Sequence, residues 1–427
     1  MTKISNKHKQ YTCKGIKRLA FLATVMVLVL NLAACATFDN FKGTFIDKDE
    51  EPEATVRIGV FEPLTGKDKE MGEMEVKGIE LAHDMFPKAL GKEVELVYGD
   101  NKSDMYVAES VAHELVDKRV SVVLGSYGSA NSLMAVKTFE KAKLPAIAIT
   151  NTNPLVTSYN PFYFRVCLLD SFQGVALAKY AVESLGATTA AIMRPENDDY
   201  AIAVAETFSD KFIQMTGNPN AVVVSCDYQP EKKTDFTEDL KKIQAAGAQV
   251  VFLPAKLEEA VKVLKEAKKL GVNALFLGTN QWDSTELVQK AGKAAAENVS
   301  FSTVFDPNTD TTVMSDNFVN AYKSKYGQDA IPESAAALGF DAYMIALDSL
   351  NKTGTALDGE ALRKTIANVR EFPGSSGTIT FDTNGDPIKS VVVMKIVGGQ
   401  AVSAYTMEPA IVNLSGAPLQ QENVQVQ

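Results

Sequence analysis

The chain has 427 residues, 46% hydrophobic and 22% charged, which is typical of a soluble globular protein with two or three domains. Its formal net charge is −10, and removal of residues 1–34 would leave 37 basic and 53 acidic residues, a net charge of −16. An acidic surface of this size argues against nucleic acid as a partner.

The first 34 residues have the pattern of a bacterial lipoprotein signal peptide. Basic residues precede a short apolar run at 19–30, which is too brief for a comfortable membrane span. The run ends in Leu32-Ala33-Ala34-Cys35, which resembles a lipobox, the signal at which a chain is cleaved before the cysteine and the cysteine is acylated. We therefore expect an extracytoplasmic protein attached to the bacterial cell membrane, on its periplasmic or outer face, through lipid on Cys35. An uncleaved anchor helix is the alternative.

Two further segments and the remaining cysteines bear on the organisation of the chain. The acidic, unpatterned residues 35–54 predict a tether, and the Gln-rich residues 413–427 predict a disordered tail. Cys167 and Cys226 each lie in an apolar, strand-like run. Two buried free thiols are expected, although the compartment permits a disulfide and the sequence does not decide between them.

From residue 55 onward, short apolar runs alternate with stretches of helical periodicity. Buried strands are predicted at 56–61, 94–99, 122–124, 145–149, 188–193, 221–226, 249–254 and 274–277. Alternation at this spacing is typical of an α/β protein with doubly wound parallel sheets, and its repetition predicts two similar lobes. Nearer the end, 334–350 predicts a helix, and 378–381 with 388–396 predict a hairpin around Asn384-Gly385 that adds an antiparallel edge.

The stretch from Val120 to Thr152 is the strongest candidate for a binding site. Here a buried strand is followed by the turn Gly125-Ser126-Tyr127-Gly128, a helix capped by Ser129, and a second strand that ends in Thr150-Asn151-Thr152. In a parallel sheet the ligand crevice lies at the carboxyl ends of the strands, and a helix that begins there directs free N–H groups into it. Such a site suits a carboxylate.

Patterns for catalysis or metal binding are weak. His8 lies in the signal segment, and His83 and His113 have no second His or Cys at ligand spacing. The sequence has no Gly-x-Ser-x-Gly elbow, phosphate loop or Gly-x-Gly-x-x-Gly turn. We therefore expect no enzyme activity, metal or cofactor. For Trp282, which follows the strand at 274–277, ligand contact and packing within a lobe are both open.

Short motifs spread along nearly the whole of residues 55–412 occur in one order. They are Ile58-Gly59-Val60 with Pro63-Leu64-Thr65-Gly66, Gly72, Lys77-Gly78, Gly125-Ser126-Tyr127-Gly128-Ser129, Lys143-Leu144-Pro145, Thr152-Asn153-Pro154, Leu277-Gly278-Thr279 with Trp282, Gly339-Phe340-Asp341-Ala342, and Phe372-Pro373-Gly374 with Gly377-Thr378-Ile379-Thr380-Phe381-Asp382. Together they resemble the substrate-binding lipoproteins of branched-chain amino acid ABC transporters, the leucine/isoleucine/valine-binding family with the type I periplasmic binding protein fold.

The resemblance implies an architecture of two doubly wound parallel-sheet lobes joined by a three-strand hinge. Lobe 1 would comprise about 55–168 and 304–374, and lobe 2 about 169–303 and 375–412. The lobes would close on a ligand by hinge bending.

The resemblance also implies roles for individual residues. The Ser129 hydroxyl and nearby N–H groups, with Tyr127 and Gly128 beside it, would bind an α-carboxylate, helped by Thr152. The Thr150 carbonyl would accept a hydrogen bond from an α-ammonium. On lobe 2, Tyr200 matches a tyrosine of the cleft.

Two positions depart from the family pattern. Where amino-acid binders place an acid for the ammonium, this chain has Asn280, and a second cleft tyrosine is replaced near Lys256. A buried ammonium without a carboxylate would be costly. Either Asp283, Glu62 or Asp199 substitutes, or the ligand is not a standard amino acid.

The leading hypothesis is a monomeric, lipid-anchored binding protein that delivers an amino acid or small carboxylate to an ABC permease. The alternative is a protein-interaction lipoprotein that reuses the fold, of the cell-wall synthase activator or sensor type, which predicts an occluded or apolar cleft.

Overall fold

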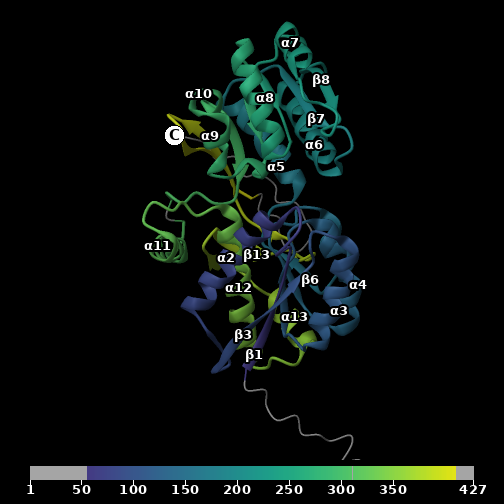
Figure 1. Ribbon diagram of the computed structural model, residues 1–427, viewed down its shortest axis with the longest axis vertical. Coiled ribbons are helices and arrows are strands. Elements are labelled where there is room, and N and C mark those ends of the chain that lie inside the picture. The colour runs from purple at the N-terminus through teal and green to yellow at the C-terminus, as the bar shows by residue number, and fades with distance from the viewer. Residues whose placement is uncertain (1–54, 310, 410–427) are drawn as a thin grey trace, which may run out of the picture. The chain divides into compact units, whose positions relative to one another are not determined.

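A computed structural model describes residues 55–309 and 311–409 of the chain (Figure 1). The predicted signal segment, the lipidation site Cys35, the tether and the tail at 413–427 lie outside the described residues. Between residues 55 and 409, leaving aside residue 310, no helix has both the length and the apolar character needed to cross a membrane.

Lobe 1 is built on a six-stranded sheet with the order β2-β3-β1-β4-β5-β6. All neighbouring strands pair in parallel except β2, which runs antiparallel to β3. The strands are β1 (Thr55–Glu62), β2 (Lys88–Ala89), β3 (Lys92–Asp100), β4 (Val122–Gly125), β5 (Ala146–Ala148) and β6 (Tyr163–Arg165). The strands predicted at 56–61, 94–99, 122–124 and 145–149 are confirmed, with ends that differ by one or two residues.

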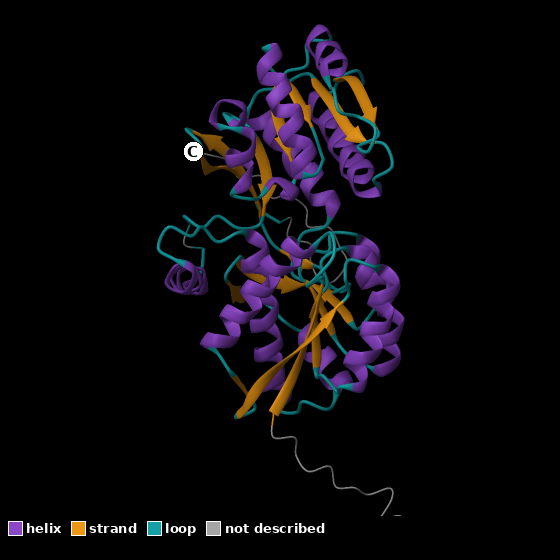
Figure 2. Ribbon diagram, in the orientation of Figure 1, coloured by secondary structure: helices purple, strands orange, loops and turns teal. Residues whose placement is uncertain are grey.

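Helices cover both faces of this sheet (Figures 1 and 2). Apolar residues of α3 (Met105–Asp117) and α4 (Ser129–Ala142) share one core with the sheet. Residues of α2 (Lys69–Met85), α11 (Val313–Tyr326), α12 (Ser334–Thr353) and α13 (Gly359–Ala367) form the core on the other face.

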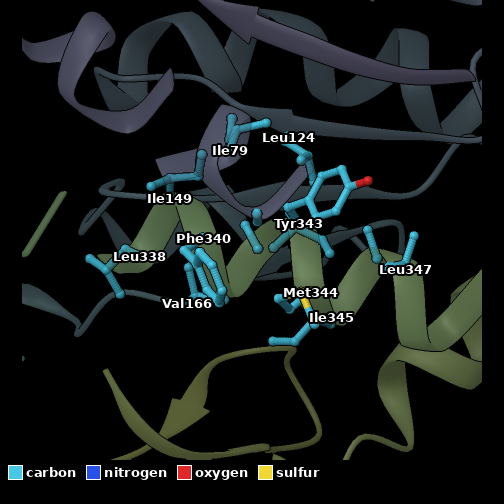
Figure 3. Packing of buried hydrophobic residues seen from close by; sticks show 14 of the residues in the cluster. Ile79, Leu124, Ile149, Val166, Leu338, Phe340, Tyr343, Met344, Ile345 and Leu347 are labelled. Atoms are coloured by element: carbon cyan, nitrogen blue, oxygen red, sulfur yellow. The ribbon is translucent and has the colours of Figure 1, made fainter. Parts of the chain in front are cut away.

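Helix α12 is the centre of the second of these cores. Nearly all of its residues from Ala335 to Leu350 are buried, as expected of a helix that is apolar on every side. Figure 3 shows Phe340 and Tyr343 of α12 among residues of α2 and the sheet. The two helices approach closely at Gly78, where a β-carbon would lie 1.8 Å from the carbonyl oxygen of Ala336. Any larger side chain at this position would force α2 away from α12.

Lobe 2 is built on a seven-stranded sheet with the order β16-β15-β11-β10-β9-β7-β8. Five strands are parallel: β7 (Ala190–Pro195), β8 (Val222–Tyr228), β9 (Val250–Phe252), β10 (Leu275–Gly278) and β11 (Ser300–Thr303). The antiparallel edge consists of β15 (Val391–Val397) and β16 (Gln400–Met407). The sequence predicted an antiparallel edge but not the strand β16.

Helices again lie on both faces of the sheet. One core includes α5 (Asp170–Lys179), the π-helical turn η2 (Tyr180–Ser184) and α6 (Asp199–Thr216). The other includes α7 (Thr237–Ala245), α8 (Leu257–Leu270), α9 (Glu286–Ala291) and α10 (Lys293–Ala296). Cys167 and Cys226 are both buried and free, which confirms the expected thiols.

The predicted hairpin near the end of the chain is wrong for most of its second strand. A small sheet joins β12 (Phe372–Gly374), β13 (Gly377–Phe381) and β14 (Pro387–Ile388), whereas residues 391–397 pair with β11 and β16. Ile379 and Phe381 lie in the core of lobe 1. Residues 377–388, expected in lobe 2, therefore pack on lobe 1, and the chain changes lobes at Lys389-Ser390, where no turn signal marks the change.

Candidate ligand-binding site

A small pocket, partly open to solvent, lies where residues that follow strands of both lobes meet residues of α5, β11 and α12. Its lining is mostly hydroxyl and amide groups, with a thiol and three aliphatic side chains. The lining residues are Thr150, Thr152, Cys167, Leu168, Gln173, Asn280, Ser302, Thr303, Val304, Ser334 and Leu338. The location at the carboxyl ends of parallel strands is where ligands bind in such sheets.

The lobe 1 wall is the loop after β5, with Thr150 and Thr152. This loop is held from behind by Arg165, whose fully buried guanidinium donates to the carbonyl oxygens of Asn151 (2.7 Å), Asn153 (2.9 Å) and Pro154 (3.3 Å). The remaining N–H groups donate to Thr157 Oγ1 (2.6 Å) and Asp386 Oδ1 (2.6 Å). The loop is thereby fixed at three of its carbonyl groups. The only sign of this arrangement in the sequence is Arg165 itself, a charged residue inside the apolar run at 162–169.

The lobe 2 wall is organised around Asn280 and Gln173. The Asn280 N–H (3.1 Å) and the Ser302 hydroxyl (3.0 Å) both donate to Gln173 Oε1. The Tyr200 hydroxyl donates to Asn280 Oδ1 at 3.0 Å. Tyr200 therefore orients the Asn280 amide and does not itself line the pocket. Gln173, which joins α5 to the loop after β10 and to β11, was missed because its role depends on segments more than 100 residues apart.

The expected carboxylate contacts lie at the start of α4, beside the pocket lining. The helix begins at Ser129, with Gly128 in the cap position at φ +84°, and the Ser129 hydroxyl makes no capping hydrogen bond. Instead, Ser129 Oγ accepts from the Asn153 N–H at 3.4 Å. The prediction that Ser129 caps the helix is corrected, because a glycine with positive φ already turns the chain there. Its hydroxyl faces the loop after β5.

Glu62 belongs to a buried pair of carboxyl groups. Glu62 Oε2 accepts from the Tyr127 N–H at 2.7 Å, and Glu75 Oε1 accepts from the Thr150 hydroxyl. Both side chains are fully buried, and Glu62 Oε1 and Glu75 Oε2 have no hydrogen-bond partner. Burial raises the pKa of Glu75 to about 7, and burial together with repulsion from Glu75 raises the pKa of Glu62 well above its usual range. The pair therefore holds a proton at neutral pH and lies behind the pocket wall.

Trp282 packs in the core of lobe 2 and does not face a ligand. Its side chain is fully buried, and its indole N–H donates to the Ala255 carbonyl at 2.8 Å. A β-carbon at Gly278 would lie 2.0 Å from the indole ring, so this glycine leaves the space that the ring occupies. Of the two interpretations left open by the sequence, packing accounts for Trp282.

The remaining lobe 2 positions that the sequence analysis named, Asp199, Lys256 and Asp283, differ in their exposure to solvent and in their hydrogen bonds. Asp199 and Lys256 are exposed at the starts of α6 and α8. Asp283 Oδ2 accepts from Thr303 Oγ1 at 2.6 Å, and burial raises the pKa of Asp283. Asp283 thus adjoins the pocket through a residue of its lining, with one carboxylate oxygen already bound.

Asp170, at the first position of α5, is an acid that the sequence analysis did not single out. It is 6% exposed, its N–H donates to the Thr152 carbonyl at 3.3 Å, and its Oδ1 has no partner. Burial raises the pKa of Asp170 to about 6. Across the described ranges, no group of three or more His, Cys, Asp or Glu residues is arranged to hold a metal ion.

Comparison with known proteins places this fold and pocket in a family. Residues 55–401 match the family described as periplasmic binding proteins. A Leu/Ile/Val-binding protein homolog from Brucella abortus is 27% identical over 347 residues, which cover 80% of this chain and 90% of the relative. The chain belongs to the periplasmic binding protein family.

Two solved structures show that, within this family, the chain is similar to branched-chain amino acid binding proteins with the type I fold. A leucine-binding protein from Thermotoga maritima is 32% identical with a TM-score of 0.75, covering 83% of this chain and 99% of that protein. A branched-chain amino acid transporter substrate-binding protein from Streptococcus pneumoniae, solved with isoleucine, is 26% identical with a TM-score of 0.74, covering 83% and 100%. The family resemblance and the two-lobed α/β fold expected from the sequence are confirmed.

Proposed function

We propose that this chain is an extracytoplasmic solute-binding lipoprotein that captures an amino acid or a related small carboxylate between its lobes and delivers it to an ABC permease. The observation that carries the proposal is the polar pocket to which loops of both lobes contribute. Ligand contacts with both lobes favour a closed state, which the permease recognises. The protein acts as a monomer held at the membrane by lipid on Cys35.

The carboxylate of the ligand binds at the start of α4. N–H groups in the first turn of a helix have no partner within the helix, and the helix dipole favours an anion there. The Ser129 and Thr152 hydroxyls donate to the same group, and the Thr150 carbonyl accepts from the ligand's ammonium. The isoleucine bound to the Streptococcus pneumoniae protein supports an amino acid as the ligand.

The polar lining favours a small ligand over the protein-interaction alternative. That alternative predicts an occluded or apolar cleft, whereas most of the residues that line the pocket carry hydroxyl or amide groups. Hydroxyl and amide groups can exchange hydrogen bonds within the wall for hydrogen bonds to a polar solute, which aliphatic side chains cannot do.

A thermal-shift screen of the mature protein against the twenty standard amino acids and small carboxylates tests the proposal. A ligand at 100 times its Kd adds about 2.7 kcal/mol to the unfolding free energy and raises the melting temperature. Ser129→Ala should weaken binding of any hit roughly tenfold or more, because it removes a donor to a charged group. Ser110→Ala, on the exposed face of α3, is the matched control. If no compound in the panel raises the melting temperature of the wild-type protein, the proposal of solute transport loses its support.

The lipid anchor has a separate test. Metabolic labelling with tritiated palmitate should mark the wild-type protein, while Cys35→Ala should take up no label and be released from membranes. Label retained by the Cys35→Ala protein would contradict acylation at this position.

A further inference from the structure

Three short segments carry the chain between the two lobes, and they pack against one another. They follow β6, β11 and β14 and comprise residues 166–169, 304 and 389–390. Leu168 of the first segment, Val304 of the second and Val391, directly after the third, belong to one apolar cluster. Leu168 and Val304 also line the pocket. The geometry of these interlobe segments therefore determines part of the pocket wall.

The third segment contains a buried lysine that is bonded to the first. Lys389 is 4% exposed, and its ammonium donates to the Ser376 hydroxyl at 2.5 Å and to the Val166 carbonyl at 3.5 Å. The Ser376 hydroxyl donates in turn to the carboxylate of Asp341, which also accepts from the N–H groups of Ser375 and Ser376. A chain of hydrogen bonds thus joins the first and third segments to α12 of lobe 1.

This arrangement depends on the charge of Lys389. Burial lowers the pKa of Lys389 to about 8, against the opposing effects of Asp341 and Cys167, which are the titratable groups that act on it. Burial also raises the pKa of Asp341, and it raises that of the Cys167 thiol to about 12. A buried ammonium is costly unless it is hydrogen-bonded and paired, so a charged Lys389 holds its acceptors in place. A neutral amine holds them less firmly.

The carbonyl that Lys389 holds lies directly before the pocket wall. Val166 precedes Cys167 and Leu168, which both line the pocket. The Cys167 thiol donates to the Asn151 carbonyl at 3.1 Å, in the loop after β5. A wall that is held in place before a ligand arrives reduces the ordering that binding must impose, and so increases affinity.

We propose that Lys389 is a positioning residue for ligand binding, which acts without touching the ligand by holding the first and third interlobe segments in the geometry that completes the pocket. The inference rests on the proposed function and adds to it a dependence of affinity on pH. Because the role requires the ammonium, affinity should fall as the pH rises through about 8. The free energy of unfolding should rise over the same range, since the folded state binds the lysine proton more weakly than the unfolded chain. A lysine that affected stability alone would not produce these opposite changes.

The probes are isoleucine and 3-methylpentanoate, which is isoleucine without its amino group. Isothermal titration calorimetry at pH 6.5, 7.5, 8.5 and 9.5 compares the mature wild type with Lys389→Met and with the control Lys395→Met, in β15. Lys389→Met should bind roughly fivefold more weakly at pH 7.5, and this difference should disappear by pH 9.5. The amino group of isoleucine titrates alike in every protein and cancels in the comparison. Lys389→Gln, which keeps a donor for Ser376, serves if the Met variant does not fold.

Two further readouts accompany the affinities. By reciprocity, ligand binding to wild type at pH 8.5 should take up a fraction of a proton, measured as the dependence of the binding heat on the ionisation enthalpy of the buffer, and Lys389→Met should take up less. Without any ligand, iodoacetamide at pH 7.5 should label Cys167 faster in Lys389→Met, as located by peptide mass spectrometry. Loss of Lys389 removes a charge that favours the thiolate, so faster labelling reports a loosened first segment.

The outcomes separate the inference from the proposed function. If wild type and Lys389→Met differ by the same factor at every pH, or if Lys395→Met shows the same loss, the positioning role is overturned while solute capture stands. If neither probe binds, capture of these solutes fails and the labelling decides the inference. Faster labelling of Cys167 in Lys389→Met then supports the positioning role, and unchanged or slower labelling overturns it.

Discussion

The buried carboxyl pair of Glu62 and Glu75 gives the fold a dependence on pH, and substitution of Glu75 removes the part that comes from its own ionisation. The pKa of Glu75 is about 7 in the folded protein and 4.5 ordinarily, so the folded state binds more protons than the unfolded chain between these values. The stability that this proton contributes is fully present below about pH 4.5 and is lost as the pH rises through about 7. At 1.36 kcal/mol for each pKa unit, the loss is about 3 kcal/mol.

Glu75→Gln tests this argument. The amide keeps an acceptor for the Thr150 hydroxyl but cannot ionise, so the variant should gain up to about 3 kcal/mol relative to wild type between pH 4.5 and pH 8. Urea unfolding of both proteins at pH 4.5, 6, 7 and 8, followed by circular dichroism, gives the difference directly. Carboxyls that do not interact with Glu75 contribute equally to both proteins, whereas in the variant the pKa of Glu62 falls because the repulsion from Glu75 is gone. Glu109→Gln, on the exposed side of α3, is the control. Parallel stability curves for wild type and Glu75→Gln would refute a protonated Glu75.

Three further substitutions test packing away from the ligand. Asp386→Asn leaves the fully buried Arg165 without its counter-charge and should lower the free energy of unfolding in urea by about 3–5 kcal/mol. An unchanged urea midpoint would show that the carbonyl oxygens alone stabilise the buried guanidinium. Trp282→Phe loses the indole hydrogen bond to Ala255 and should lower the free energy of unfolding by about 1–3 kcal/mol with ligand affinity unchanged. Weakened affinity would indicate that Trp282 contributes to ligand binding after all. Burial lowers the pKa of Lys389 to about 8, so wild type should gain stability from about pH 8 to 10.5. Lys389→Met should lose that gain, and an equal gain in both proteins would contradict the buried lysine.

The parts of the fold that follow from the sequence are those with local apolar patterns. The strands predicted at 122–124 and 249–254 contain short apolar runs between helical stretches, and residues 122–124 and 250–254 are buried in the structure. Strand β16 was missed because most of its residues are exposed, so it lacks an apolar pattern. The hairpin was extended too far because most of 388–396 is apolar and Lys389, at the change of lobe, is itself buried near Asp341.

The candidate site was predicted in part, and the omissions share one cause. Thr150, Thr152 and Asn280 directly follow predicted strands, and all three line the pocket. Asp170 and Arg165 owe their positions to contacts between segments far apart in the chain. The Arg165–Asp386 ion pair, for example, spans 221 residues. Such convergence leaves no periodic signal, and a single charged residue in an apolar run predicts burial with a partner without naming the partner.

Most of the buried side-chain atoms without a hydrogen-bond partner in the described part of the chain lie near the loops that surround the pocket, and none of them belongs to a residue of its lining. Native proteins satisfy almost all buried polar groups, so exceptions need a physical reason. Among the described residues, six of the eight buried side-chain atoms without a partner belong to residues in or beside the loops after β1, β5 and β10: Glu62, Glu75, Asn151, Asp170, Thr279 and Gln281. None of the six residues lines the pocket, so these atoms gain partners only if the loops rearrange, and closure of the lobes on a ligand is the event that would move the loops.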